Sequence, residues 1–298
     1  MKEDEASSTA YTVVHGILHT AQNPQLSYLL NDEIIEANTK ILSATSQGRQ
    51  RLLELHHPLK RYILPFLEWL LLPGITLNYV LRKKYIEEQV VRVIEEGVTQ
   101  VVNIGAGFDT LAMRLSKHYP SITFIEIDHP ATSKHKVEAL GDEAGATNLY
   151  FSEADLSQTS LQEALKGCDG FDSNKKTLYI SEGVLMYLSE ADVSKVFDSI
   201  RALSGEEALF IFSAMEPNWS KKNNVRVLLH LYLKLKKESY LWYIPDTKIS
   251  EFVDRQGFTI IDMADTEYYR ENYLHEDYTK TLHKGEYVVM TKVGKDEI

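Results

Sequence analysis

A glycine-containing turn is the first feature of the sequence that could bind a ligand. Gly105 and Gly107 lie in the run Asn103-Ile-Gly-Ala-Gly-Phe-Asp-Thr110, after a short apolar segment and before a predicted helix. Glycines at such a turn let the backbone approach a ligand closely, and the next helix directs its N-terminus to the same place. Thr110 replaces the third glycine of the dinucleotide-binding fingerprint, which disfavours NAD or FAD without excluding them.

Carboxylates follow three further predicted strands. Asp128 lies roughly 20 residues after Gly105, the spacing at which a carboxylate can accept both hydroxyls of a ribose. Asp155 follows the third strand and Glu182 follows the fourth. Ligands of open α/β sheets bind outside the carboxyl ends of the strands, so we expect these four residues to line one rim. An acidic rim suits a cofactor with amino, hydroxyl, ammonium and sulfonium groups better than a polyphosphate.

A parallel sheet is needed to bring these residues together. Between residues 82 and 214 apolar strand patterns alternate with helical patterns, and the alternation resumes near the C-terminus. Strands alternating with helices predict a doubly wound, mostly parallel α/β sheet covered on both faces. The predicted strands are 100–104, 122–128, 149–151, 177–181, 208–212, 258–261 and 286–290.

Two segments fall outside this alternation. Residues 1–81 show helical spacing interrupted by Pro65 and Pro73-Gly74, which predicts an N-terminal helical cap on a domain of residues 82–298. Residues 215–245 are predicted to be a lid insertion after the fifth strand. Substrate residues are expected in these variable parts. In the insertion, the basic side chains of Lys221, Lys222 and Arg226 could pair with an anionic acceptor. The walls of an apolar pocket could come from the aromatic residues Trp219, Tyr232, Tyr240, Trp242 and Tyr243.

Composition excludes several classes of protein. The 298 residues include 32 basic and 43 acidic side chains, a net charge of −11, so the basic excess typical of nucleic-acid binders is missing. The single cysteine, Cys168, cannot form an internal disulfide or a Cys-rich zinc site, and we expect no metal. The N-terminus is acidic, and the most apolar stretch is interrupted before about 20 residues. We therefore expect a soluble, cytoplasmic protein.

Four motifs, in order, resemble the leucine carboxyl methyltransferase family of class I S-adenosylmethionine-dependent methyltransferases. They are Gln100–Thr110, Phe124–Pro130 followed by Lys134 or Lys136, Ala154-Asp-Leu156, and Ser181–Leu188. The resemblance covers about residues 82–205 and implies a seven-stranded, Rossmann-like sheet. The family includes enzymes that methylate a protein C-terminal leucine carboxylate. It also includes bacterial relatives, some of them polyketide O-methyltransferases.

The resemblance implies contacts with S-adenosyl-L-methionine residue by residue. Gly105 would approach the methionine part and Asp128 the ribose, and Gly107 would be a further contact with the cofactor. Asp155 and Leu156 would surround the adenine, and Glu182 would lie near the amino group. The family also has an arginine before the glycine loop that pairs with the cofactor's carboxylate. Arg82 is favoured because its guanidinium matches a carboxylate bidentately, but Lys83 and Lys84 stay open as alternatives.

The predicted reaction is methyl transfer to a carboxylate or hydroxyl of a small molecule, polyketide-like or another organic acid. A carboxylate acceptor is already ionised, whereas a hydroxyl acceptor needs a base, and the sequence shows no compelling base. Tyr187 and Arg226 are the candidates for positioning the acceptor. A protein C-terminal carboxyl methyltransferase, a nicotinamide-dependent oxidoreductase and a non-catalytic cofactor-binding module are the alternatives. The sequence leaves the acceptor and the oligomeric state open.

Overall fold

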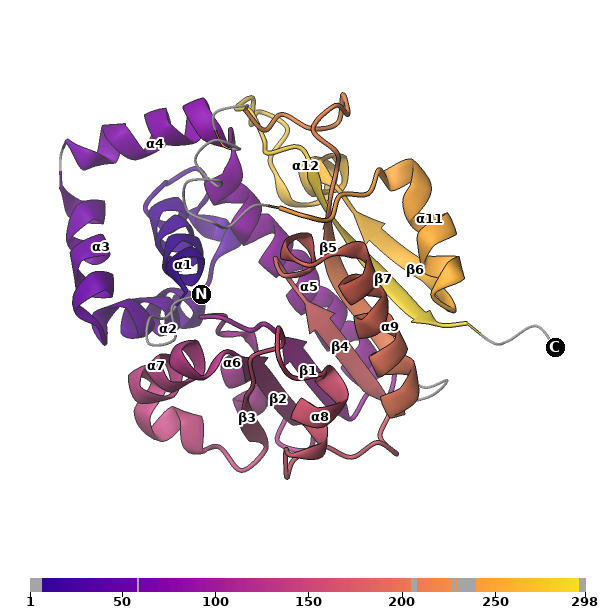
Figure 1. Ribbon diagram of the computed structural model, residues 1–298. Helices are drawn as coiled ribbons and strands as arrows, with labels where there is room; N and C mark the ends of the chain where they lie inside the picture. The colour runs from indigo at the N-terminus through magenta and orange to yellow at the C-terminus, as the bar shows by residue number, and fades with distance from the viewer. Residues whose placement is uncertain (1–6, 58, 205–207, 227–228, 230–239, 295–298) are drawn as a thin grey trace.

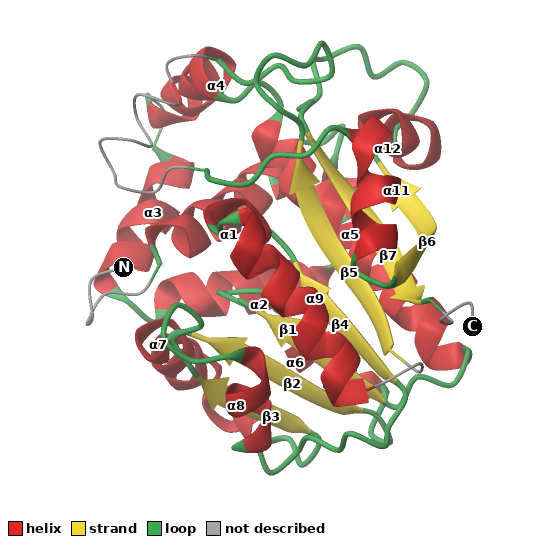
Figure 2. Cartoon of the chain, turned by 45° about the vertical axis from the view of Figure 1, so that its right-hand side comes forward, coloured by secondary structure: helices red, strands yellow, loops and turns green. Residues whose placement is uncertain are grey.

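A seven-stranded sheet forms the centre of the protein, with helices on both faces (Figures 1 and 2). The computed structural model describes residues 7–57, 59–204, 208–226, 229 and 240–294. Every predicted strand is present, and several are longer than predicted. The strands are β1 (Gln100–Ile104), β2 (Thr123–Asp128), β3 (Leu149–Glu153), β4 (Thr177–Ser181), β5 (Ala208–Met215), β6 (Phe258–Ala264) and β7 (Glu286–Val293).

The strand order is β3-β2-β1-β4-β5-β7-β6. Strands β1 to β5 pair in parallel, and β7 runs antiparallel to both of its neighbours. The predicted doubly wound, mostly parallel sheet is therefore confirmed. Strand order reverses between β1 and β4, and such a switch point opens a crevice at the carboxyl ends of the strands.

Two hydrophobic clusters cover the two faces of the sheet, because side chains alternate along each strand. Val101 and Phe124 pack in one cluster, their neighbours Val102 and Ile125 in the other. On the first face lie α1 (Ser8–Ala21), α2 (Asp32–Ser43), α5 (Ile75–Glu95), α6 (Leu111–His118), α7 (Pro130–Leu140) and α12 (Thr266–Tyr273). On the second lie α8 (Leu161–Lys166), α9 (Glu190–Ser204) and α11 (Asp246–Arg255).

The N-terminal segment is helical, as predicted, and includes η1 (Ser27–Leu29), α3 (Ser46–His56) and α4 (Lys60–Leu71) (Figure 1). Helix α5 begins at Ile75, inside the segment predicted to be the cap. Gly74 (φ +80°) precedes this helix and Gly97 (φ +96°) follows it, with no helix breaker between them. The boundary predicted between residues 81 and 82 thus falls inside α5, which joins the cap to the sheet.

Between β5 and α11 the chain returns along η3 (Leu185–Tyr187). The backbone N–H groups of Leu241 and Trp242 donate to the Met186 carbonyl at 2.7 and 3.2 Å. Tyr232, a predicted lid residue, lies outside the described residues. Helix α12 was not predicted. In the part of the chain that the structure describes, every helix is too short or too polar to cross a membrane.

Candidate functional site

The four predicted rim residues lie at one edge of the sheet. Gly105 follows β1, Asp128 ends β2, and Glu182 follows β4, while Asp155 lies two residues beyond β3. Because these four strands are parallel, their carboxyl ends meet at the same edge. Gly105 and Glu182 flank the switch point itself.

The glycine loop lacks side chains where space is smallest. Gly105 has φ +69°, and a Cβ atom there would lie 2.4 Å from Cγ2 of Val184. Gly107 has φ +52°, and its added Cβ would touch Ala10 of α1 at 3.5 Å. Tyr11 of α1 also packs edge-on against Phe108, with ring centroids 4.8 Å apart. The N-terminal helix therefore covers the loop.

Asp128 fastens the glycine loop to the end of β2. Its Oδ2 accepts the N–H of Gly107 at 2.6 Å, and its Oδ1 accepts the N–H of His129 at 2.7 Å. Burial raises the pKa of this carboxyl group, and the two N–H donors oppose the rise. A carboxylate has about four acceptor positions, so two remain for hydroxyl groups of a ligand.

A buried ion pair supports the same strand end. Lys136 pairs with Glu126, and both side chains are almost fully buried. Lys134 is exposed. Of the two lysines of the second motif, Lys136 is therefore the one that contacts β2. Its ammonium also favours the ionised form of Asp128.

An ion cluster occupies the other side of the switch point. Nε and NH2 of Arg82 lie 2.8 and 2.7 Å from Oε1 of Glu182, and Nζ of Lys83 lies 3.0 Å from its Oε2. Lys83 also reaches Asp109 at 3.1 Å. Arg82 pairs in addition with Glu286, the first residue of β7. Sequence reasoning missed Glu286, although an acid that begins an otherwise apolar strand was the available signal.

Of the three candidate cations, Arg82 and Lys83 contact Glu182, whereas Lys84 pairs with Glu88 at 3.0 Å. Burial alone would lower the pKa of Arg82, but Glu286 and Glu182 raise it above its ordinary value. Burial likewise opposes ionisation of Asp109, yet Lys83, Lys136 and the N–H of Leu111 together outweigh it, and the pKa falls to about 2. Arg82, Lys83 and Asp109 are therefore charged at neutral pH.

Asp155 and Leu156 have looser surroundings. The Asp155 carboxylate accepts the N–H and Oγ–H of Ser157 at 2.9 and 2.7 Å, and these bonds lower its pKa. Leu156 packs against the second hydrophobic cluster. The two residues bound the far end of the rim, at the outermost strand.

Three tyrosines surround the ion cluster. Tyr187 and Tyr240 pack with ring centroids 5.3 Å apart, and the Tyr79 ring lies 5.7 Å from the guanidinium carbon of Arg82. Burial raises the pKa of Tyr79 and Tyr240, so both remain neutral hydrogen-bond donors. Tyr79 was not predicted, since one tyrosine on a long helix carries no distinguishing pattern.

The other predicted lid residues lie elsewhere. Trp242 is a core residue that packs on Phe212 and Phe252, and Trp219 is exposed. The predicted cations Lys221, Lys222 and Arg226 are also exposed. Lys222 pairs with Asp246, and the backbone N–H of Arg226 donates to the Leu71 carbonyl. The ring centroids of Tyr243 and Tyr240 lie 6.3 Å apart.

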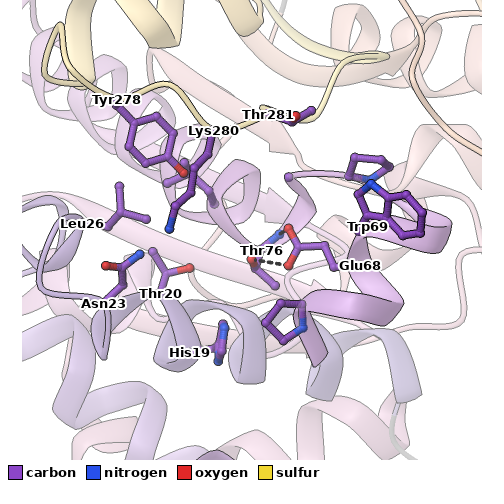
Figure 3. Close-up of a pocket in the computed structure, with 14 residues that line it drawn as sticks. His19, Thr20, Asn23, Leu26, Glu68, Trp69, Thr76, Tyr278, Lys280 and Thr281 are labelled. Atoms are coloured by element: carbon purple, nitrogen blue, oxygen red, sulfur yellow. Dashed lines mark hydrogen bonds between the residues drawn. The ribbon is translucent and has the colours of Figure 1, made fainter. Parts of the chain in front are cut away.

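A cavity of about 310 Å³ lies between the N-terminal helices and the segment before β7 (Figure 3). Thr20, Leu26 and Leu77 are buried, while Trp69 and Lys280 are exposed. The Glu68 carboxylate accepts the Thr76 hydroxyl at 2.8 Å, and burial raises its pKa. The cavity is lined by His19, Thr20, Asn23, Leu26, Pro65, Glu68, Trp69, Pro73, Gly74, Thr76, Leu77, Tyr278, Lys280 and Thr281.

Tyr79 links this cavity to the ion cluster. The charges that act on its hydroxyl include Arg82 and Glu286 of the cluster and Glu68 of the cavity wall. Thr76 lies one helical turn before Tyr79 on α5, on the same side of the helix. The hydroxyl of Tyr79 is thus within electrostatic reach of both the ion cluster and Glu68, although Tyr79 does not line the cavity.

Known proteins resemble this chain in sequence and in fold. The family model described as leucine carboxyl methyltransferase matches residues 18–201, a longer span than the 82–205 expected, because it includes the N-terminal helices. Two Mycobacterium tuberculosis proteins, each named "Putative S-adenosyl-L-methionine-dependent methyltransferase", are 33% and 35% identical over 133 and 130 residues. These stretches cover 44% and 41% of this chain but only 37% and 39% of the relatives.

Among solved structures, one titled as a putative methyltransferase from Thermobifida fusca YX has a TM-score of 0.59 at 15% identity. The superposition covers 86% of this chain and 94% of that one. At this level of identity the likeness concerns the fold, which is the seven-stranded sheet with helices on both sides.

Proposed function

The chain belongs to the leucine carboxyl methyltransferase family, and on this premise we propose that it transfers a methyl group from S-adenosyl-L-methionine to the carboxylate of a small organic acid. One observation carries the proposal. Gly105 and Glu182 lie on either side of the switch point, and Arg82 and Lys83 form ion pairs with Glu182. The names of the mycobacterial relatives support the same cofactor.

The residues present fit this cofactor. Gly105, with its positive φ, lets the chain turn tightly at the switch point, and Asp128 keeps free acceptor positions for ribose hydroxyls. The methionine end carries both a carboxylate and an ammonium group, and the cluster offers cations and anions side by side. Arg82 and Lys83 would hold the carboxylate, Glu182 the ammonium group, and Asp155 with Leu156 the adenine.

When bound, the cofactor supplies a methyl group on a sulfonium, which an oxygen nucleophile attacks in line as the carbon–sulfur bond breaks. The chain contributes by orienting the acceptor and excluding water, and much of the rate acceleration in such a reaction comes from positioning. Helix α1 over the glycine loop and the segment 240–245 over η3 provide the cover.

The groups beside the cluster favour a carboxylate over a hydroxyl as acceptor. Tyr79 and Tyr240 have raised pKa values, so they donate hydrogen bonds and do not act as bases. Burial, assisted by Arg82, lowers the pKa of His283 to about 3, which makes it a poor base at neutral pH. An ionised carboxylate needs no base, and neutral phenols can orient its oxygens.

The cavity beside Tyr79 supports a small acceptor. Its volume of about 310 Å³ lies at the lower end of the range of small-molecule pockets, and Leu26, Leu77 and Trp69 give it apolar walls. We propose that the body of the acid occupies this cavity while its carboxylate meets the tyrosine hydroxyls.

Two measurements test the function. Isothermal titration with S-adenosylhomocysteine should give saturable binding to the wild type and much weaker binding to Asp128→Ala. If the wild type binds NADH saturably and does not bind S-adenosylhomocysteine, the proposal is wrong. Incubation with tritiated S-adenosylmethionine and separate panels of carboxylic acids and phenols should then give label that mild base releases as methanol. Methyl esters release it, whereas ethers do not. Base-stable label would make a hydroxyl the acceptor, and label only on peptides would favour a protein C-terminus.

A further inference from the structure

Arg82 is shared by two carboxylates from distant parts of the chain. Glu182 follows β4, and Glu286 begins β7. One carboxylate takes Nε and NH2 of the guanidinium and the other takes NH1. The side chains of Arg82, Glu182 and Glu286 are 6%, 7% and 4% exposed. Burying a guanidinium this deeply is costly unless its charge is paired, and the two carboxylates together compensate that charge.

Glu286 is itself held in place. Its Oε2 accepts the Nδ2–H of Asn78 at 2.9 Å, and Asn78 lies one turn before Arg82 on α5. The contacts Asn78–Glu286–Arg82 thus form a closed loop between one helix and one strand. Glu286 therefore has a single arrangement relative to α5, and Arg82 takes its orientation from it.

The direction of β7 explains why this acid reaches the rim. An antiparallel strand begins at the edge where its parallel neighbours end, and Glu286 pairs in register with Met215, the last residue of β5. Glu286 also lies outside the matched span 18–201, so the family match assigns it no role.

We propose that Glu286 is a positioning residue for cofactor binding: it holds the Arg82 guanidinium ready for the methionine carboxylate. This inference rests on the proposed function. Arginine side chains have many rotamers, and a side chain ordered before binding loses less entropy when the ligand arrives. Glu286 acts through Arg82 and belongs to the binding machinery only in that sense.

The test compares two ligands that share the adenosine part. S-adenosylhomocysteine carries the amino-acid end, whereas 5′-methylthioadenosine lacks it. The quantity measured by titration calorimetry is the ratio of their dissociation constants in each variant. Glu286→Ala should reduce the preference for S-adenosylhomocysteine about tenfold or more, with 5′-methylthioadenosine affinity within about twofold of wild type.

Two further variants separate orientation from charge and from folding. Glu286→Gln keeps an acceptor for Arg82, and the Asn78 amide can turn to accept from it, so the preference should stay within about threefold of wild type. Asn78→Leu removes only the hydrogen bond from Asn78 to Glu286, so the preference for S-adenosylhomocysteine should fall by less than in Glu286→Ala. Thr291→Val is the matched control, because Thr291 lies farther along β7 and bonds the Phe210 carbonyl instead.

Each outcome has one meaning. If Glu286→Ala weakens both ligands equally, or leaves the ratio at its wild-type value, Glu286 is only structural and the inference is wrong. If Glu286→Gln loses as much preference as Glu286→Ala, charge and not orientation is responsible, which also overturns it. If the wild type binds neither ligand, the proposed function is wrong, and the role inferred for Glu286 is wrong with it.

Discussion

The guanidinium of Arg82 on α5 and the carboxylate of Glu286 on β7 form a buried ion pair at the carboxyl edge of the sheet. The pair joins the segment before the glycine loop to β7. Because Glu182 holds the same guanidinium, the switch point is bounded by charges whose positions are mutually fixed.

Arg82 is expected to be the principal anchor of the cofactor carboxylate. Arg82→Lys keeps the positive charge but loses the bidentate fork, so the affinity for S-adenosylhomocysteine should fall about tenfold. Lys84→Gln is the control, because Lys84 pairs with Glu88 on the outer side of α5. Titration calorimetry of both variants checks this. An equal loss in Lys84→Gln would show that the anchor has been assigned to the wrong cation.

Gly105 is expected to tolerate no side chain. In Gly105→Ala the new Cβ would meet Cγ2 of Val184 at 2.4 Å, in addition to the strain of φ +69°. Gly97→Ala also has a positive φ (+96°) and nothing within 4 Å, so it reports the backbone strain without a clash, about 1 kcal/mol. Urea unfolding should show a larger loss for Gly105→Ala. The second substitution Val184→Ala should restore part of it, and no restoration would contradict the steric explanation.

Asp128 is expected to act on both the loop and the ribose. Asp128→Asn keeps the shape, but an amide has one acceptor oxygen and cannot serve Gly107, His129 and a ribose together. The affinity for adenosine-containing ligands should fall about tenfold to a hundredfold, equally for S-adenosylhomocysteine and 5′-methylthioadenosine. Asp142→Asn, at an exposed acid, is the matched control. A loss restricted to S-adenosylhomocysteine would place Asp128 at the methionine end instead.

Filling the cavity should separate acceptor binding from cofactor binding. Thr281 lines the cavity from an exposed position, so Thr281→Trp adds bulk without disturbing the core (Figure 3). We expect the KM for the acid to rise about tenfold or more while S-adenosylhomocysteine affinity stays unchanged. Thr279→Trp changes an exposed threonine of the same segment that does not line the cavity. Identical kinetics of the two variants would remove the cavity from the proposed acceptor site.

His283 is expected to make the protein less stable as the pH falls. Burial lowers its pKa to about 3, whereas the unfolded chain binds the proton below about pH 6.5. Between these values the unfolded state holds more protons, so the free energy of unfolding decreases by up to about 1.4 kcal/mol per pH unit. Urea unfolding between pH 7 and pH 5 measures the slope. His283→Gln should reduce it, while His15, with a pKa of about 4, keeps its own contribution. A slope unchanged in His283→Gln would show that this histidine does not titrate as the structure indicates.

The sheet and its rim could be predicted because they depend on local patterns. Short apolar runs between helical segments specify the strands, and parallel pairing then brings their carboxyl ends to one edge. Gly105, Asp128, Asp155 and Glu182 follow from that rule alone. Tertiary contacts decide the rest. Glu286 reaches the rim because β7 reverses its direction, and no spacing in the sequence reports that reversal.

The substrate side was harder to predict for the same reason. Aromatic residues near position 240 suggested a pocket wall, yet Trp242 packs in the core on Phe212. Residue type alone does not separate a pocket wall from a core. The cavity instead combines the N-terminal helices with Tyr278, Lys280 and Thr281, a segment that showed no motif. Segments this far apart in sequence meet through tertiary packing, including that of α1 on α5 and of residue 74 on residues 282–283.

The reversed last strand also sets an order for synthesis on the ribosome. Arg82, the glycine loop and Glu182 emerge first, but the second carboxylate for Arg82 arrives only with residue 286. A nascent chain shorter than this exposes an arginine that lacks one of its two counter-ions and an edge of β5 that lacks its neighbour. The ion cluster of the site is therefore complete only after residue 286 has been synthesised.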